Sequence, residues 1–202
     1  YPHRVNLFAQ IDRNMTAFVS DLLQVDAIEA KKLQKQYYLE HGTTLQGLMI
    51  HHKVDPNAFL ERAHAIDYSA LLPHPALGEA IRALPGRKFI LTSGTHAHVG
   101  ETLSRLGIAD RFDGVFDIVD AGYLPKPAEA TYAAFLGRFA IAPAAAAMFE
   151  DAPRNLVVPR ALGMRTVLVT GQKAPRPIAP AADFVISDLP GFLSNIADTL
   201  SG

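Results

Sequence analysis

Residues 146–169 read AAMFEDAPRNLVVPRALGMRTVLV, and this stretch decides the fold class. It opens with a short apolar run, Ala146–Phe149, which predicts a strand. A helix is predicted over Arg154–Leu162, and Gly163 can end it because glycine tolerates the left-handed conformation at a helix terminus. A second apolar run, Thr166–Val169, predicts the next strand. Two strands joined by a helix favour a parallel sheet, since parallel strands need a crossover connection.

The same alternation of strand and helix extends over residues 73–202. Helices are predicted at about 96–106 and 128–139. Further strands are predicted by the apolar runs Lys88–Leu91, Val115–Val119 and Phe184–Ile186. Strands that alternate with helices of this length are typical of an α/β domain whose parallel sheet is covered on both faces.

The N-terminal part of the sequence has patterns that predict helices and no strands. Apolar residues recur every three or four positions over Leu7–Leu23, which is the spacing of one face of an amphipathic helix. Asp26 and Asp55 are typical capping residues and predict the starts of two further helices. Another helix is predicted at about Thr44–His51. This part of the chain, residues 7–72, is expected to form a small helical domain.

The composition limits the class of protein. The chain has 202 residues, 49% of them hydrophobic and 19% charged, which favours a folded globular protein over a disordered one. The formal net charge is -1 with no basic run, so nucleic acid is not an expected partner. No apolar run reaches about 18 residues, so no membrane span is expected. Cys is absent, which excludes disulfides and thiolate metal sites and fits a reducing compartment such as the cytoplasm.

Polar residues of related chemistry follow three of the predicted strands. They are Thr92 and Ser93 after the first, Lys126 in the loop after the second, and Glu150 and Asp151 after the third. Ligands of open parallel sheets bind at the carboxyl ends of the strands, so these side chains are expected to lie together. Hydroxyls and an ammonium group suit a phosphoryl group, and paired carboxylates suit Mg²⁺. The sequence therefore predicts a site for phosphoryl transfer.

Each of these residues also has an ordinary structural interpretation. Ser93 or Thr95 could cap the following helix, Lys126 could be a solvated loop residue, and Asp151 could cap a helix. The functional interpretation rests on their coincidence, because three successive strands each deliver a group of the required kind. His96 and His98 form a His-x-His pair, but on a helix their side chains point apart, which disfavours a shared metal ion.

In this order, the motifs resemble those of the haloacid dehalogenase-like hydrolase superfamily. The resemblance is carried by Thr92-Ser93-Gly94, Lys126-Pro127, Phe149-Glu150-Asp151 with Asn155-Leu156, and Leu162-Gly163-Met164. Within the superfamily the chain is similar to the pyrimidine 5'-nucleotidase-like phosphatases. The supporting stretches are residues 37–49 (YYLEHGTTLQGLM), 59–67 (FLERAHAID) and 106–120 (LGIADRFDGVFDIVD). Together they extend the match along most of the chain.

The resemblance implies an α/β fold with a Rossmann-like parallel sheet core. A small helical cap, here residues 7–72, would be inserted after the first strand and close over the substrate. In that cap the residues facing the substrate would be Thr43, Thr44 and Gln46. Gln46 stands where relatives often have Arg, so the contact with the leaving group is open.

The resemblance also implies roles in the α/β domain, for a phosphoryl-binding set and a metal-binding set. The first set comprises Thr92, Ser93 and Lys126, of which Thr92 and Lys126 would act in catalysis. The second set comprises Asp151 as a direct Mg²⁺ ligand, Glu150 as a ligand acting directly or through water, and Asn155 behind them.

The family's first motif, Asp-x-Asp-x-Thr, has no counterpart in this sequence. Asp12 and Asp21 fall within the helical front, with no strand before them. The first core strand, with its nucleophilic aspartate, is therefore expected upstream of Tyr1. The implied reaction is hydrolysis of a phosphomonoester through an aspartyl-phosphate intermediate.

The expected function is that of a Mg²⁺-dependent phosphatase for a small phosphorylated metabolite, with a nucleoside 5'-monophosphate preferred. Two alternatives stay open. One is a haloacid dehalogenase, which uses an aspartate nucleophile without Mg²⁺, and the other is a non-catalytic protein that binds a phosphorylated ligand or a partner. The motif upstream of Tyr1 would discriminate among the three. Neither a nucleic acid nor a membrane is an expected partner, and a homodimer is left open.

Overall fold

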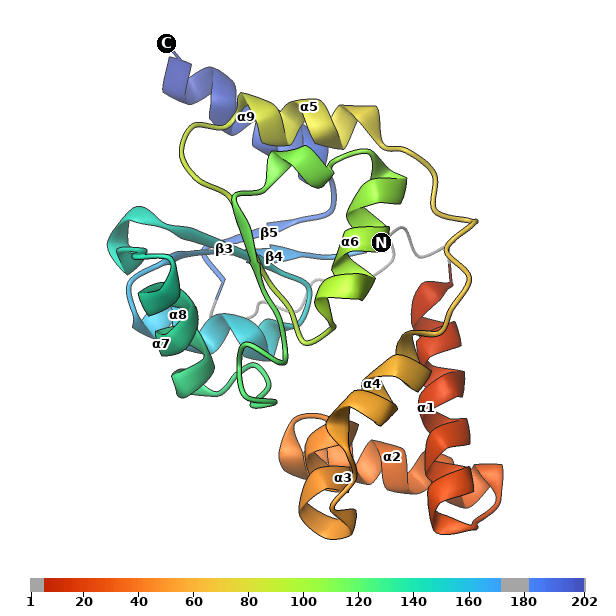
Figure 1. The fold of residues 1–202 in the computed structure, drawn as a ribbon. Helices are drawn as coiled ribbons and strands as arrows, with labels where there is room; N and C mark the ends of the chain where they lie inside the picture. Colours follow the sequence, from red (N-terminus) through yellow and green to blue (C-terminus); the bar gives the residue numbers. More distant parts are fainter. Residues whose placement is uncertain (1–5, 172–181, 202) are drawn as a thin grey trace. The chain divides into compact units, whose positions relative to one another are not determined.

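The computed structural model describes residues 6–171 and 182–201, and the chain divides into two compact units (Figure 1). The first unit contains the described residues up to Leu72 together with Thr92–Arg105 and Asp117–Pro125. The second contains Pro73–Leu91, Leu106–Phe116 and the described residues from Lys126 onward. The first unit thus adds two short segments to the predicted helical domain.

The first unit is mainly helical, as the periodicity predicts. Its helices are α1 (Leu7–Leu23), α2 (Ala27–His41), α3 (Thr44–His52), α4 (Pro56–His64) and α6 (His96–Leu106). The predicted caps are present at two helix starts. The Asp26 carboxylate accepts hydrogen bonds from the backbone N–H groups of residues 28 and 29, and the Asp55 carboxylate accepts one from residue 57. These bonds satisfy donors that the first helical turn leaves without partners.

The helices of this unit pack around one apolar core. Its buried members are Val19, Ala30, Tyr37, Leu45, Leu48, Phe59, Leu60, Ala63 and Ile118. α2 and α3 approach closely because Gly47 has no side chain. A Cβ atom at Gly47 would lie 2.4 Å from Cβ of Tyr37, so a larger residue would push the two helices apart.

The second unit contains the strands, and all of the described strand pairs are parallel. β1 (Phe89–Leu91) pairs with β2 (Gly114–Phe116), and β3 (Ala147–Glu150), β4 (Arg165–Val169) and β5 (Phe184–Ile186) form a sheet in that order. Every predicted strand is present, which confirms the α/β class. β2 ends before the predicted Val119 because the Asp117 carboxylate accepts backbone hydrogen bonds from residues 119 and 120 and closes a turn.

Helices flank these strands. α5 (Pro75–Ala83) and α9 (Leu189–Ser201) pack together on one side, and α7 (Glu129–Arg138) and α8 (Val157–Ala161) lie on the other (Figure 1). α5 and α9 are absent from the sequence prediction, in the case of α5 because Pro73 and Pro75 disfavour a continuing helix. Pro75 in fact begins the helix, at a position where its missing N–H has no partner to lose.

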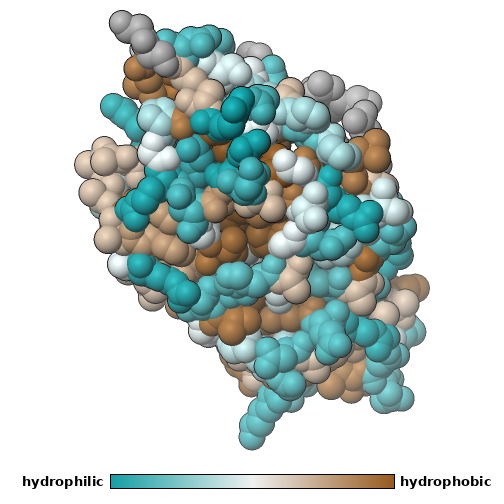
Figure 2. All heavy atoms as spheres, turned by 45° about the horizontal axis from the view of Figure 1, so that its top comes forward, coloured by the Kyte–Doolittle hydropathy of each residue, from teal (hydrophilic) through white to brown (hydrophobic). Residues whose placement is uncertain are grey.

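Apolar side chains reach the surface of each unit. On the face drawn in Figure 2, hydrophobic patches alternate with hydrophilic ones. The most exposed large apolar residues include Phe8, Ile28 and Leu39 in the first unit and Val157 and Leu200 in the second. Single exposed apolar residues are common on folded proteins. No helix within the described ranges combines the length and apolarity that a bilayer crossing requires.

Candidate active site

Lys126 and Glu150 form a buried ion pair in the second unit. Nζ of Lys126 lies 2.5 Å from Oε2 of Glu150 and donates a second hydrogen bond, at 3.2 Å, to the carbonyl oxygen of Leu91. Leu91 ends β1 and Glu150 ends β3, two strands that do not pair with each other. The ammonium group therefore links the carboxyl ends of both strands, and two of the predicted site residues lie together.

The second carboxylate oxygen of Glu150 is also engaged. Oε1 accepts hydrogen bonds from the backbone N–H groups of Asp151 at 3.1 Å and Ala152 at 3.2 Å. Burial acts to raise the pKa of Glu150, but the Lys126 ammonium and these hydrogen bonds outweigh it and hold the pKa below its usual value. Glu150 is thus a buried carboxylate that stays ionised because its charge is compensated.

Asp151 follows directly and stands exposed at the end of the strand. Partial desolvation of its carboxyl group, together with a hydrogen bond to Glu150 and the negative charge of Glu150, raises the pKa of Asp151. Two adjacent carboxyl groups of this kind repel each other, and a divalent cation would relieve the repulsion. Asp151 is the carboxylate of the pair that is accessible to such a cation.

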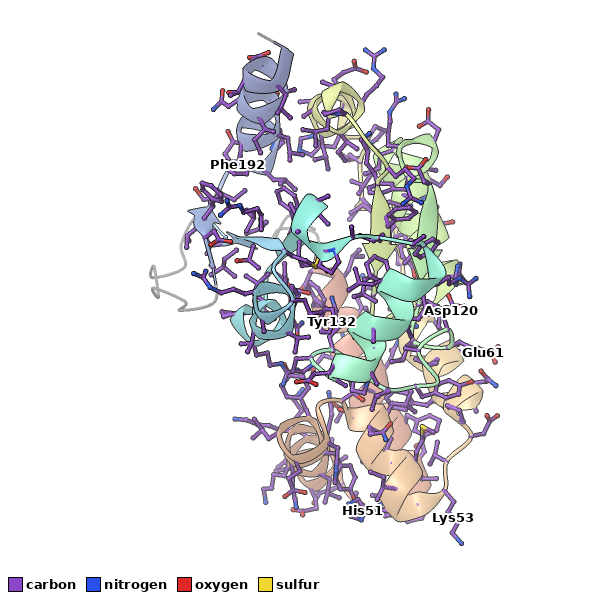
Figure 3. The ribbon with its side chains drawn as sticks, turned by 90° about the vertical axis from the view of Figure 1, so that its left-hand side faces the viewer. His51, Lys53, Glu61, Asp120, Tyr132 and Phe192 are labelled. Atoms are coloured by element: carbon purple, nitrogen blue, oxygen red, sulfur yellow. The ribbon has the colours of Figure 1, made fainter. Side chains whose placement is uncertain are left out.

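Asn155 lies behind these residues in the 3-10 turn Pro153–Leu156. Its backbone carbonyl accepts a 2.6 Å hydrogen bond from the hydroxyl of Tyr132, which lies on α7 (Figure 3). Burial and the charge of Glu150 raise the pKa of Tyr132, so its hydroxyl remains a donor. Oδ1 of Asn155 is buried without a hydrogen-bond partner in the structure. A buried acceptor of this kind can receive a hydrogen bond from a bound water molecule.

Thr92 and Ser93 belong to the first unit and are described within it. Oγ1 of Thr92 accepts a hydrogen bond from the backbone N–H of Gly94 at 3.0 Å, and Ser93 is exposed beside it. The backbone N–H of His98 bonds to Oγ1 of Thr95 at 3.3 Å. Of the two predicted capping candidates, Ser93 and Thr95, it is therefore Thr95 that caps the helix.

The predicted substrate residues of the cap lie at the start of α3. Oγ1 of Thr43 accepts a hydrogen bond from the backbone N–H of Gln46 at 3.1 Å. Both residues are partly exposed to solvent. Thr44 is buried, and its hydroxyl donates to the carbonyl oxygen of Gln34 at 3.1 Å. That bond joins α3 to α2, so the hydroxyl of Thr44 serves the packing of the cap.

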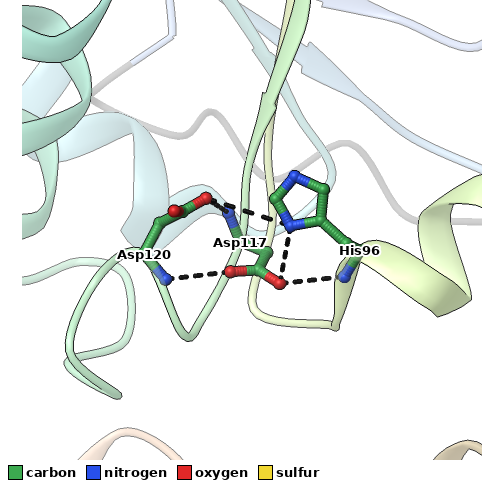
Figure 4. A group of neighbouring side chains, drawn as sticks. All are labelled: His96, Asp117 and Asp120. Carbon is green, nitrogen blue, oxygen red and sulfur yellow. Dashed lines mark hydrogen bonds and ion pairs between the residues drawn. The ribbon is translucent and has the colours of Figure 1, made fainter.

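A further polar cluster, which the sequence reasoning missed, consists of His96, Asp117 and Asp120 (Figure 4). One ligand atom from each residue lies within 4.8 Å of the others. Nδ1 of His96 is 2.8 Å from Oδ2 of Asp117 and 3.9 Å from Oδ2 of Asp120. The spacing of Asp117 and Asp120 along the chain was the signal that could have found this cluster.

The hydrogen bonds of Asp117 give this cluster a structural explanation. Its buried carboxylate accepts bonds from the backbone N–H groups of His96, Val119 and Asp120, all at 2.9 Å. Burial acts to raise the pKa of Asp117, but these bonds and His96 lower it. Asp117 thus joins the start of α6 to the 117–120 turn. His98 points elsewhere, with Nδ1 2.7 Å from the hydroxyl of Tyr68, so His96 and His98 do not face a common point.

Comparison with known proteins identifies the family. The family model described as a haloacid dehalogenase-like hydrolase matches residues 9–163, which is most of the chain. The chain belongs to the haloacid dehalogenase-like hydrolases. In this hydrolase the matched region includes the predicted motifs around Thr92, Lys126 and Glu150-Asp151.

Several solved structures share the fold. A haloacid dehalogenase family phosphatase from Thermococcus onnurineus is 20% identical, with 97% of this chain and 91% of that chain covered and a TM-score of 0.61. The L-2-haloacid dehalogenase from Xanthobacter autotrophicus, with chloropropionic acid covalently bound, is 17% identical, with 95% and 93% covered and a TM-score of 0.55. A family hydrolase from Deinococcus radiodurans with bound phosphate and sodium is 18% identical, with 93% and 89% covered and a TM-score of 0.52. At these levels of sequence identity, the similarity shows a shared fold and not a shared activity.

Proposed function

We propose that this hydrolase is a Mg²⁺-dependent phosphomonoesterase of the pyrimidine 5'-nucleotidase-like group, acting on a small phosphorylated metabolite such as a nucleoside 5'-monophosphate. The observation that carries the proposal is the arrangement of Lys126, Glu150 and Asp151 at the strand ends of the second unit. An ammonium group beside two carboxylates can hold both a phosphoryl oxygen and a divalent cation.

The residues present fit a Mg²⁺ ion. Asp151 offers an accessible carboxylate, and the unpartnered Oδ1 of Asn155 offers an acceptor for a coordinated water molecule. Both oxygens of Glu150 already have partners, which favours a contact through water for this residue. Mg²⁺ usually binds one or two carboxylates and keeps several waters. When bound, it would neutralise charge on the phosphoryl oxygens.

The residues of the chain supply the other parts of the mechanism. Lys126 would stabilise the negative charge that develops on the phosphoryl group, because its ammonium is held in place by Glu150 and by the carbonyl of Leu91. We assign contacts with the phosphoryl oxygens to Thr92 and Ser93. Thr43 and Gln46 would contact the leaving group from the cap.

The nucleophile of the proposed reaction is an aspartate upstream of Tyr1. Among the described strands, β1 and β3 each pair along one edge only, and Lys126 links their carboxyl ends. These open edges support a further parallel strand between them that ends in the nucleophile. Its carboxylate would attack phosphorus and form an acyl-phosphate. A second acid would protonate the leaving alkoxide and then activate the water that releases phosphate.

An assay with the protein that includes the residues preceding Tyr1 tests the proposal. p-Nitrophenyl phosphate and a panel of nucleoside 5'-monophosphates are supplied with Mg²⁺ and, in parallel, with excess chelator. We expect phosphate release that requires Mg²⁺. Chloride release from 2-chloropropionate that persists in chelator would instead indicate a dehalogenase. Binding of phosphate esters without turnover would indicate a non-catalytic protein.

A further inference from the structure

Three imidazoles and a phenol ring gather at one end of the first unit, far along the sequence from Lys126, Glu150 and Asp151. The group consists of Tyr37, His41, His51 and His52. His41 lies in the last turn of α2, and His51 and His52 lie in the last turn of α3. Figure 3 shows His51 and Lys53 at the same end of this unit.

Two of the imidazoles point their Nε2 atoms at each other. Nε2 of His41 and Nε2 of His51 are 2.9 Å apart. At this distance one nitrogen carries a proton and donates it, and the other accepts with its lone pair. Two imidazole nitrogens on a tetrahedral Zn²⁺ at about 2.05 Å lie roughly 3.3 Å apart. A small opening of the pair would therefore let a cation replace the shared proton.

The rings are held in place before any cation binds. The ring of Tyr37 stacks on His51, with centroids 5.3 Å apart and an interplanar angle of 15°. The hydroxyl of Tyr37 lies 2.7 Å from Nε2 of His52, which gives that third imidazole a different partner. Close packing of Tyr37 against Gly47 fixes α2 and α3 relative to each other. The entropy lost on binding is accordingly small.

The electrostatic surroundings favour a cation. The last turns of α2 and α3 present backbone carbonyls, whose partial negative charge attracts positive groups. Oε2 of Glu40 lies 3.7 Å from Nε2 of His41, on a side chain that is half exposed. Its carboxylate adds negative charge beside His41.

We propose that His41 and His51 bind a late first-row transition-metal cation of the Zn²⁺ class through their Nε2 atoms, with water molecules in the other coordination positions. Imidazole ligands select Zn²⁺, Cu²⁺ or Ni²⁺, whereas carboxylates and water suit Mg²⁺. The site therefore differs in metal class from the pair Glu150 and Asp151, and it does not rest on the proposed phosphatase function. On binding, the donating imidazole takes the tautomer with its proton on Nδ1, so that both Nε2 lone pairs face the cation and the metal joins α2 to α3.

Isothermal titration of the protein, without an affinity tag, with Zn²⁺ tests this site. Excess Mg²⁺ is present throughout so that carboxylate sites of the other unit do not contribute. We expect one Zn²⁺ per chain, and a loss of affinity of about 10-fold or more in both His41→Gln and His51→Gln. The matched control is His52→Gln, on the same helix turn, which should keep the affinity because His52 bonds to Tyr37.

NMR of the imidazole nitrogens is a second measurement. It uses the chain without substitutions, so misfolding of a variant cannot affect the result. Addition of Zn²⁺ should shift the Nε2 resonances of His41 and His51 and leave those of His64 and His98 in place. Absence of binding in either measurement would overturn the proposal. It would also be overturned if His41→Gln and His51→Gln bound Zn²⁺ as tightly as His52→Gln does.

Discussion

Glu150 keeps its charge inside the protein because Lys126 and two backbone N–H groups surround it. The pair has 13% and 7% of its side-chain surface exposed, so solvent screens it weakly. Removing the ammonium leaves a buried carboxylate without compensation. The strength of this coupling can be measured by the stability of the folded protein.

For Lys126→Met we predict a loss of about 3–5 kcal/mol in the free energy of unfolding, measured with urea. The double variant with Glu150→Gln should lose less, since the uncompensated charge is removed as well. Lys32→Met is the control, because its pair with Glu29 is exposed and should cost less than about 1 kcal/mol. Equal losses for Lys126→Met and Lys32→Met would contradict the buried-pair interpretation.

A second residue-scale prediction concerns His98. Burial, together with the adjacent His64, lowers the pKa of His98 from 6.5 to about 4. Between these values the unfolded chain binds a proton that the folded chain does not, so stability falls as the pH falls. We expect a decrease of up to about 3 kcal/mol between about pH 7 and pH 4 from this residue.

The measurement is urea unfolding across that pH range for the parent protein and for His98→Gln. The variant should lose this part of the pH dependence, whereas His51→Gln, which replaces an exposed histidine, should retain it. If the unfolding free energy of His98→Gln fell with pH as steeply as that of the parent protein, His98 would have the same pKa in the folded and unfolded chains, and the prediction would be wrong.

At the scale of elements, short-range patterns predict most helices and strands correctly. Apolar spacing indicates α1, and capping residues indicate the starts of α2 and α4, because both signals are local. α5 could not be predicted in this way, since its prolines have the same local signature as a break. The shortening of β2 depends on the hydrogen bonds of Asp117, which apolar patterning does not report.

The packing of α2 on α3 depends on Gly47. We predict that Gly47→Ala lowers the free energy of unfolding by about 1–3 kcal/mol, because the new Cβ would lie 2.4 Å from Cβ of Tyr37. Gly100→Ala on α6 is the matched control. Among the described residues, no atom outside the backbone of its own helix turn lies within 4 Å of the added Cβ, so stability should stay equal or rise by up to about 1 kcal/mol. Unfolding in urea distinguishes the two variants. If Gly47→Ala left the free energy of unfolding unchanged, α2 and α3 could move apart without loss of stability, and the prediction would be wrong.

At the scale of the whole molecule, the sequence predicts the α/β class and the family, because strand–helix alternation and motif order are visible in it. Within the second unit it also predicts that Lys126 and Glu150 lie at neighbouring strand ends. The use of both Glu150 oxygens, the unpartnered amide oxygen of Asn155 and the cluster of His96 with Asp117 required coordinates. The pairs Lys126–Glu150 and His96–Asp117 join residues far apart along the chain, and the missing partner of Asn155 depends on how its surroundings fold.

The central claim is that Asp151 belongs to a Mg²⁺-dependent phosphatase site. The most direct measurement is the rate of phosphate release from p-nitrophenyl phosphate at saturating Mg²⁺, using a protein that carries the proposed upstream strand. Asp151→Asn is compared with Asp110→Asn, which alters a surface aspartate of the same unit. We predict a loss of about 100-fold or more for Asp151→Asn and an unchanged rate for Asp110→Asn. Equal rates for the two variants would contradict the account.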